Sequence, residues 1–95
     1  MLEALRVTIV AGALGAALLV VPTARAADQN FCAQYAQAAL NQVHGGLAIP
    51  RCAAGMKGPR WAPEYRVHYD WCLGASYDAA QKERELRTAF LQGCR

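Results

Sequence analysis

The chain has 95 residues, of which 55% are hydrophobic, and its formal net charge is +3 at pH 7. Its ten basic residues are spread along the sequence, which excludes the concentrated positive surface that nucleic-acid binding needs. A chain of this length forms one domain, and so small a core is marginal without further covalent or metal ties.

The first 26 residues are expected to be a secretory signal peptide. Arg6 gives a weakly basic start, residues 7–21 are uncharged, and Ala24 and Ala26 are the small residues that precede a cleavage point. The uncharged run is shorter than the roughly 20 apolar residues of a membrane-spanning helix. Retention of this segment as a membrane anchor is the alternative. Cleavage after Ala26 would leave a soluble domain, residues 27–95, with eight basic and six acidic residues and a net charge of +2.

Four cysteines in the mature chain are interpreted as two structural disulfides. They are Cys32, Cys52, Cys72 and Cys94. Disulfides are typical of small exported domains, so the expected location is the periplasm or the medium. No pair has the Cys-x-x-Cys spacing of a zinc knuckle or a redox centre, and Cys-x-x-Cys-His for haem is absent, so no metal or cofactor is expected.

The first mature segment is predicted to be a helix. Asp28 or Asn30 can cap its start, and Gly45-Gly46 are expected to end it, with His44 beside the negative end of its dipole. The residues that recur at helical spacing and form its apolar face are Cys32, Tyr35, Ala36, Ala39, Leu40 and Val43.

Residues 47–62 are predicted to be a loop that Cys52 holds in place. The segment contains two glycines, two prolines and no sustained period. Its length suggests a functional loop, but the favoured interpretation is a plain crossing in which Trp61 fills the core.

Two further helices are predicted after this loop. One begins at Pro63-Glu64 and ends at Gly74, and the other begins with Ser76 as its cap and reaches Cys94. The face of the first is formed by Tyr65, His68, Tyr69 and Cys72, and the buried stripe of the second by Ala79, Leu86, Phe90 and Cys94. Residues 82–87 are expected to face solvent, with the pairs Asp78–Lys82 and Glu83–Arg87 four residues apart.

The sequence therefore predicts an all-α, three-helix domain stapled by disulfides. If the last helix runs back along the first, Cys94 lies beside Cys32. Cys72 then lies beside Cys52, near the exit of the first helix. This gives the predicted pairs Cys32–Cys94 and Cys52–Cys72.

The stretch HYDWC at residues 68–72 is the one local pattern that suggests chemistry. His68 and Cys72 share a helix face, whereas Asp70 is two residues from each and points elsewhere. A general base and the carboxylate that orients it must be in hydrogen-bond contact, so His68 and Asp70 do not form a dyad. The pattern favours a packed histidine, and no enzyme is favoured.

Binding candidates are aromatic or sit in the loop. Arg60 beside Trp61 can make a bidentate contact with an anion while the ring stacks. Trp71 and Trp61 are expected to fill the core, and their alternative is an exposed aromatic platform.

HYDWC also resembles the His-Asp-x-Cys motif of secreted phospholipases A2. In that family the histidine activates water and the adjacent aspartate helps to bind calcium. The resemblance implies the same roles for His68 and Asp70. Here Tyr69 separates the two residues, and the family's glycine-rich calcium loop has no counterpart.

A second resemblance covers most of residues 31–94. The order FCAQYA, GPRW, HYDWC and a helix that ends in Leu-x-x-Cys is similar to small, uncharacterised exported proteins of alphaproteobacteria. It implies a shared fold and periplasmic placement, and no activity.

Three functions follow as hypotheses. The first is a periplasmic binding or interaction module for a protein, peptide or glycan. The second is a small hydrolase centred on His68, and the third is a structural or stress-related envelope protein. Contact with a membrane is expected only if the signal segment is retained.

Overall fold

A computed structural model describes residues 26–95 as an all-α domain with two disulfides. The predicted signal peptide, apart from Ala26, lies outside the described residues. In chain order the elements are α2 (Gln29–Leu47), α3 (Pro50–Ala53), the 3-10 helix η2 (Pro59–Trp61), α4 (Tyr65–Leu73) and α5 (Tyr77–Cys94). The described part of the chain has no strand, only an isolated bridge between Ala26 and Ser76. The predicted helical class is confirmed.

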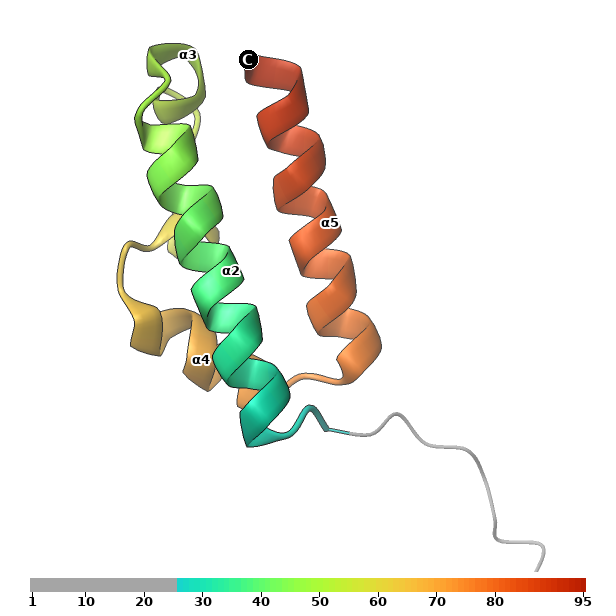
Figure 1. The fold of residues 1–95 in the computed structure, drawn as a ribbon. Coiled ribbons are helices and arrows are strands. Elements are labelled where there is room, and N and C mark those ends of the chain that lie inside the picture. Colours follow the sequence, from blue (N-terminus) through green and yellow to red (C-terminus); the bar gives the residue numbers. More distant parts are fainter. Residues whose placement is uncertain (1–25) are drawn as a thin grey trace, which may run out of the picture.

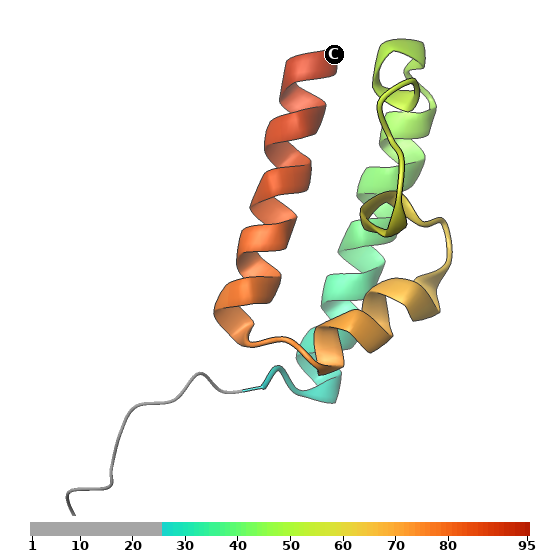
Figure 2. The ribbon, with the colours of Figure 1, turned by 180° about the vertical axis from the view of Figure 1, so that it is seen from behind.

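The two long helices, α2 and α5, lie side by side and run in the same direction (Figures 1 and 2). The segment from α3 to α4 brings the chain back from the end of α2 to its start, and α4 packs against α2. The last helix therefore runs parallel to the first.

This direction corrects the predicted disulfide pairing. The bonds are Cys32–Cys72 and Cys52–Cys94, with Cα–Cα distances of 5.5 and 5.0 Å. The predicted pairs Cys32–Cys94 and Cys52–Cys72 are wrong because the last helix was taken to run back along the first. In the fold, α4 ends near the start of α2, and α5 then carries Cys94 to the opposite end, beside α3.

Both predicted helix caps are confirmed. The Asp28 carboxylate accepts the backbone N–H of Phe31 at 2.8 Å and the Tyr77 hydroxyl at 2.7 Å, so it caps α2 and ties it to α5. The Ser76 hydroxyl accepts the N–H of Ala79 at 3.0 Å and caps α5. Each helix start thus has one of its free N–H groups satisfied by the predicted side chain.

The first helix was predicted to end at Gly45-Gly46, but the structure shows that it does not. The helix continues to Leu47, and Gly46 is buried. A Cβ on Gly46 would lie 2.7 Å from Leu91 Cδ2 and 2.7 Å from Met56 Sδ, so this glycine permits close packing.

The segment 47–62 contains more structure than a loop. Cys52 lies in α3 and Trp61 in η2, and both are buried. Gly58, with φ of 88°, makes the turn into η2. The interpretation of Trp61 as a core residue is confirmed. The next helix, α4, begins at Tyr65 rather than at Pro63-Glu64.

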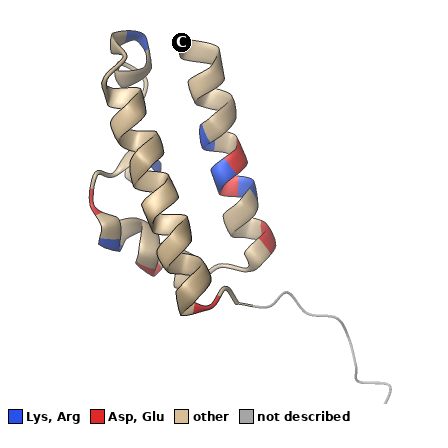
Figure 3. Ribbon diagram, in the orientation of Figure 1, with Lys and Arg blue, Asp and Glu red and all other residues tan. Residues whose placement is uncertain are grey.

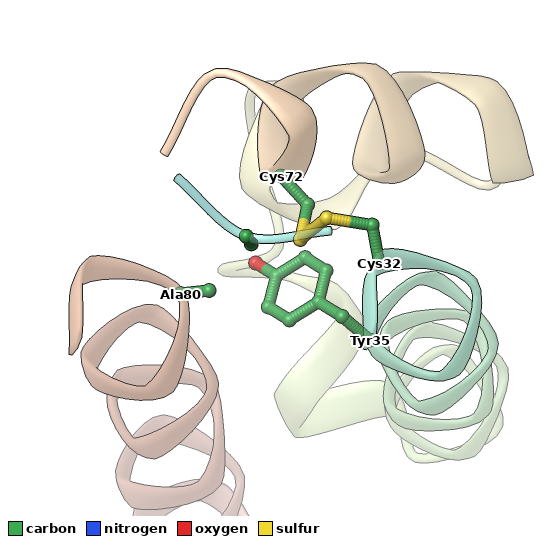
Figure 4. Close-up of a cluster of buried hydrophobic side chains, with 5 residues drawn as sticks. Cys32, Tyr35, Cys72 and Ala80 are labelled. Atoms are coloured by element: carbon green, nitrogen blue, oxygen red, sulfur yellow. A yellow bond between two sulfur atoms is a disulfide. The ribbon is translucent and has the colours of Figure 1, made fainter. Parts of the chain in front are cut away.

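The core consists of two hydrophobic clusters, one around each disulfide. The Cys32 cluster contains Ala27, Cys32, Tyr35, Cys72 and Ala80. Figure 4 shows its tyrosine ring beside the disulfide, between α2 and α5. The Cys52 cluster contains Val43, Cys52, Met56, Trp61 and Leu91.

The buried face of α5 is shifted by one position from the predicted stripe. The residues that it buries are Ala80, Arg87 and Leu91, whereas Ala79 and Leu86 are exposed and Phe90 and Cys94 are partly buried. Arg87 belongs to the stretch expected to face solvent, yet only 1% of its surface is exposed. The predicted stripe was wrong because Leu86 was assigned to the buried face for its hydrophobicity and Arg87 to the exposed face for its charge.

Candidate functional site

A polar network occupies the middle of the α2–α5 contact, between the two clusters. Arg87 Nε donates to Gln42 Oε1 at 2.7 Å. Gln42 Nε2 in turn donates to Thr88 Oγ1 at 2.9 Å, which fixes the amide with its oxygen toward the arginine. One guanidinium N–H thereby has a firm acceptor.

The Arg87 guanidinium also lies over the aromatic ring of Tyr35. Arg87 Cζ is 5.0 Å from the centroid of the Tyr35 ring, within the range of a cation–π contact. Burial raises the pKa of the Tyr35 hydroxyl above its ordinary value of 10.0, whereas hydrogen bonding to Arg87 and the charge of Arg87 partly oppose that shift. Arg87 therefore interacts with Tyr35 as well as with Gln42, both of α2.

The rest of the Arg87 guanidinium is poorly satisfied. Its Nη2 atom is buried and has no hydrogen-bond partner among the described residues. Its Nη1 atom is 3.9 Å from Glu83 Oε2, beyond hydrogen-bond distance. A buried donor without an acceptor costs about 1–3 kcal/mol, more if it is charged. This unmet donor is the most unusual feature of the described domain.

Glu83 is engaged by a second arginine. Arg60 on η2 donates from Nε and Nη2 to its two carboxylate oxygens, at 2.5 and 3.1 Å. This hydrogen bonding raises the pKa of Arg60. Helix α2 carries no Lys, Arg, Asp or Glu, and Figure 3 shows several charged residues along the middle of α5 beside it. The Glu83 carboxylate lies near the guanidinium groups of both Arg60 and Arg87.

A cavity of about 290 Å³ opens beside these charges. Its walls are formed by Tyr35, Pro59, Arg60, Val67, His68, Trp71, Glu83 and Arg87. Trp71 is 44% exposed, and its ring lies 5.6 Å from that of Tyr35 between centroids. The cavity therefore joins a charged wall from α5 and η2 to an apolar wall from α4.

His68 is buried in this cavity's wall. Its Nε2 donates to the Ala62 carbonyl at 2.7 Å, which places a proton on Nε2. Asp70 is exposed on α4 and pairs with Arg66 at 3.1 Å. The fold does not bring His68 and Asp70 together, in agreement with the prediction that they form no dyad.

The predicted binding residues are divided by the fold. Arg60 and Trp71 line the cavity, whereas Trp61 belongs to the Cys52 cluster and packs against Phe90, with ring centroids 5.0 Å apart and ring planes tilted by 50°. Arg60 and Trp61 thus do not lie in the same site, whereas Arg60 and Trp71 line one cavity. The expectation that Trp71 fills the core is wrong, because 44% of its surface is exposed.

Five cavity residues were not proposed from the sequence as site residues: Tyr35, Pro59, Val67, Glu83 and Arg87. A signal for Arg87 did exist, since it lies seven residues after Ala80 and four before Leu91. That spacing marks a core position on a helix.

Residues 26–95 contain no group of three or more metal-ligating His, Cys, Asp or Glu side chains. Among these residues, no helix is long and apolar enough to cross a membrane. The chain matches no family model, and no curated protein or solved structure is significantly similar to it. The resemblance to exported alphaproteobacterial proteins therefore stays a prediction.

Proposed function

We propose that this protein is an extracytoplasmic binding protein that holds a small organic ligand, or the end of a peptide, between Arg87 and Trp71. The observation that carries the proposal is the buried guanidinium with an unmet donor in a cavity wall. A buried charge with incomplete partners weakens a fold, and such exceptions are expected where function requires them.

Export is the second element of the proposal. Disulfides are typical of proteins outside the cytosol, and residues 1–26 have the layout of a signal peptide. Ala27, the first residue after the expected cleavage point, is buried, and its backbone N–H donates to the Ala75 carbonyl at 2.9 Å. Cleavage after Ala26 would thus leave the described core complete. The periplasm is the simplest destination.

Binding is favoured over hydrolysis by the way in which His68 is held. A general base must come within hydrogen-bond reach of the proton that it takes. The His68 side chain is only 3% exposed, and Asp70, the carboxylate considered with it, pairs with Arg66 instead. The aromatic and charged walls, by contrast, form a ready binding surface.

An NMR titration tests this function. Small aromatic acids, amides, amines and alcohols are added in turn to the uniformly ¹⁵N-labelled protein. At least one class is expected to shift the amide signals of Val67, His68, Trp71 and Glu83. If no class shifts these signals, the proposed function is wrong.

A pair of variants controls for non-specific contact. Trp71→Ala removes the apolar wall and is expected to weaken binding by about tenfold. Leu47→Ala removes another exposed apolar side chain, at the end of α2 and outside the cavity, and is expected to leave binding unchanged.

A further inference from the structure

We propose that the ligand is a monocarboxylate attached to one apolar group, with its carboxylate on Arg87 and its apolar group on Trp71. This inference rests on the proposed function, since it names the ligand class of the same cavity. It follows from the donors, the charge and the size of the cavity.

The donors select a planar anionic acceptor. Nη2 of Arg87 has two N–H groups and no acceptor among the described residues, and Nη1 of Arg60 takes no part in the pairing with Glu83. Guanidinium N–H groups match the paired oxygens of a carboxylate in spacing and plane. A carboxylate bound at the Arg87 end of the cavity would lie beside both guanidinium groups and offer them acceptors.

The net charge of the cavity walls favours a ligand with a single negative charge. The cavity walls contain two guanidinium groups and one carboxylate, and α2 adds no formal charge. One negative charge on the ligand balances this set, whereas a dianion such as a phosphate monoester would leave an excess that faces Glu83. An amine would meet the net positive charge directly.

The size selects a small apolar group. A volume of about 290 Å³ is at the lower end of the range for ligand cavities, about 300–1,000 Å³. The apolar wall of Pro59, Val67 and Trp71 therefore has room for one aromatic or branched group. Two sources share this chemistry: a free arylalkyl acid, and the C-terminal residue of a peptide with an apolar side chain.

Calorimetry with matched probes tests the inference. The free-acid arm compares 3-phenylpropionate with its neutral amide, and the peptide arm compares Gly-Gly-Phe with a free and an amidated C-terminus. In at least one arm the carboxylate is expected to bind about tenfold more tightly than the amide. The arm with the tighter carboxylate identifies the source.

The outcomes that contradict the carboxylate inference can be told apart from those that contradict the proposed function. If each amide binds as tightly as its acid and shifts the cavity signals, the carboxylate inference is wrong and the proposed function stands. If phenylpropyl phosphate or phenethylamine binds more tightly than the acid, the inference is also wrong. If none of the probes shifts the cavity signals, the inference is overturned, and the wider panel of the previous titration decides the proposed function separately.

Two substitutions on α5 assign the preference to the arginine. Arg87→Met is expected to remove the preference for acid over amide, whereas Arg84→Met, at an exposed position outside this cavity, is expected to retain it. An acid preference that survives in a folded Arg87→Met protein would overturn the assignment.

A third variant covers the case in which Arg87→Met does not fold. Glu83→Gln raises the cavity charge by one and releases Arg60 from its carboxylate partner. It is expected to tighten binding of 3-phenylpropionate by about tenfold and to leave the amide unchanged. Unchanged or weaker acid binding would contradict the inference.

Discussion

Arg87 on α5 donates its Nε–H to Gln42 Oε1 on α2, 2.7 Å away, in the middle of the contact between the two long helices. Apolar clusters lie toward both ends of this contact, and each is closed by a disulfide. The polar pair therefore interrupts a core that an apolar pair could continue. The cavity opens on the same arginine.

Substitutions at this pair are expected to be strongly non-additive. Gln42→Leu leaves Arg87 Nε buried without its acceptor and should lower the free energy of unfolding by about 3 kcal/mol. Arg87→Met should cost less, about 1 kcal/mol, because it removes the bond to Gln42 but also removes the buried charge and its unsatisfied donor. The double variant should recover most of the loss, as measured by urea unfolding.

The control for this cycle is Gln34→Leu, at an exposed position of the same helix. It should change stability by less than about 0.5 kcal/mol. Additive effects of the two single substitutions would mean that the pair is not coupled.

The disulfide pairs can be separated by peptide mapping. A digest of the oxidised protein should yield one peptide pair that joins Cys32 to Cys72 and one that joins Cys52 to Cys94. The paired residues are 40 and 42 positions apart, so chain-entropy arithmetic gives an upper value of about 4 kcal/mol for each bond. Double Cys→Ala variants of either pair should therefore lose similar stability. A mapped Cys32–Cys94 peptide would contradict the parallel arrangement of α2 and α5.

The two neighbouring glycines of α2 should respond oppositely to alanine. Gly45 has no atom within 4 Å of an added Cβ, so Gly45→Ala should stabilise the helix by about 0.5 kcal/mol. At Gly46 an added Cβ meets Leu91 and Met56 at 2.7 Å, and repacking should make the substitution destabilising by about 1 kcal/mol. Thermal unfolding measures both. Equal stabilisation at the two sites would contradict the close packing of Gly46.

The stability of the domain should fall in alkali because of Tyr35. Burial raises the pKa of its hydroxyl, so the folded state keeps this proton to higher pH than the unfolded state. Its contribution is complete below pH 10.0, the ordinary pKa, and is lost as the pH rises through the raised folded value. Tyr35→Phe should flatten this decline in the free energy of unfolding, whereas Tyr65→Phe, at a less buried tyrosine, should not. An equal slope in wild type and Tyr35→Phe would exclude this cause.

Local signals predicted most of the fold. Helical spacing and the caps at Asp28 and Ser76 depend on residues close together in the chain, and the structure confirms these helices and caps. The cysteine count predicted two disulfides but not which cysteines pair. The path of the segment 47–62 and the direction of α5 depend on long-range packing, which has no local signal. The disulfide pairing was wrong for that reason.

The candidate site was predicted only in part. Arg60 was proposed as a binding residue because arginine is typical of binding surfaces, whereas Trp71 was expected in the core, with an exposed platform only as the alternative. Arg87 was missed because its charge indicated solvent, although its spacing from Ala80 and Leu91 indicated the core. A charged residue that falls at a core position of a helix indicates a buried charge, and this pattern would have identified Arg87.

The most direct measurement is the set of intermolecular NOEs between the phenyl protons of 3-phenylpropionate and the protein. We expect NOEs to the side chains of Trp71 and Val67, together with a shift of the Arg87 Nε–H signal. NOEs from the bound probe to Thr88 and Gln92 instead, on a different surface between α2 and α5, would contradict this expectation.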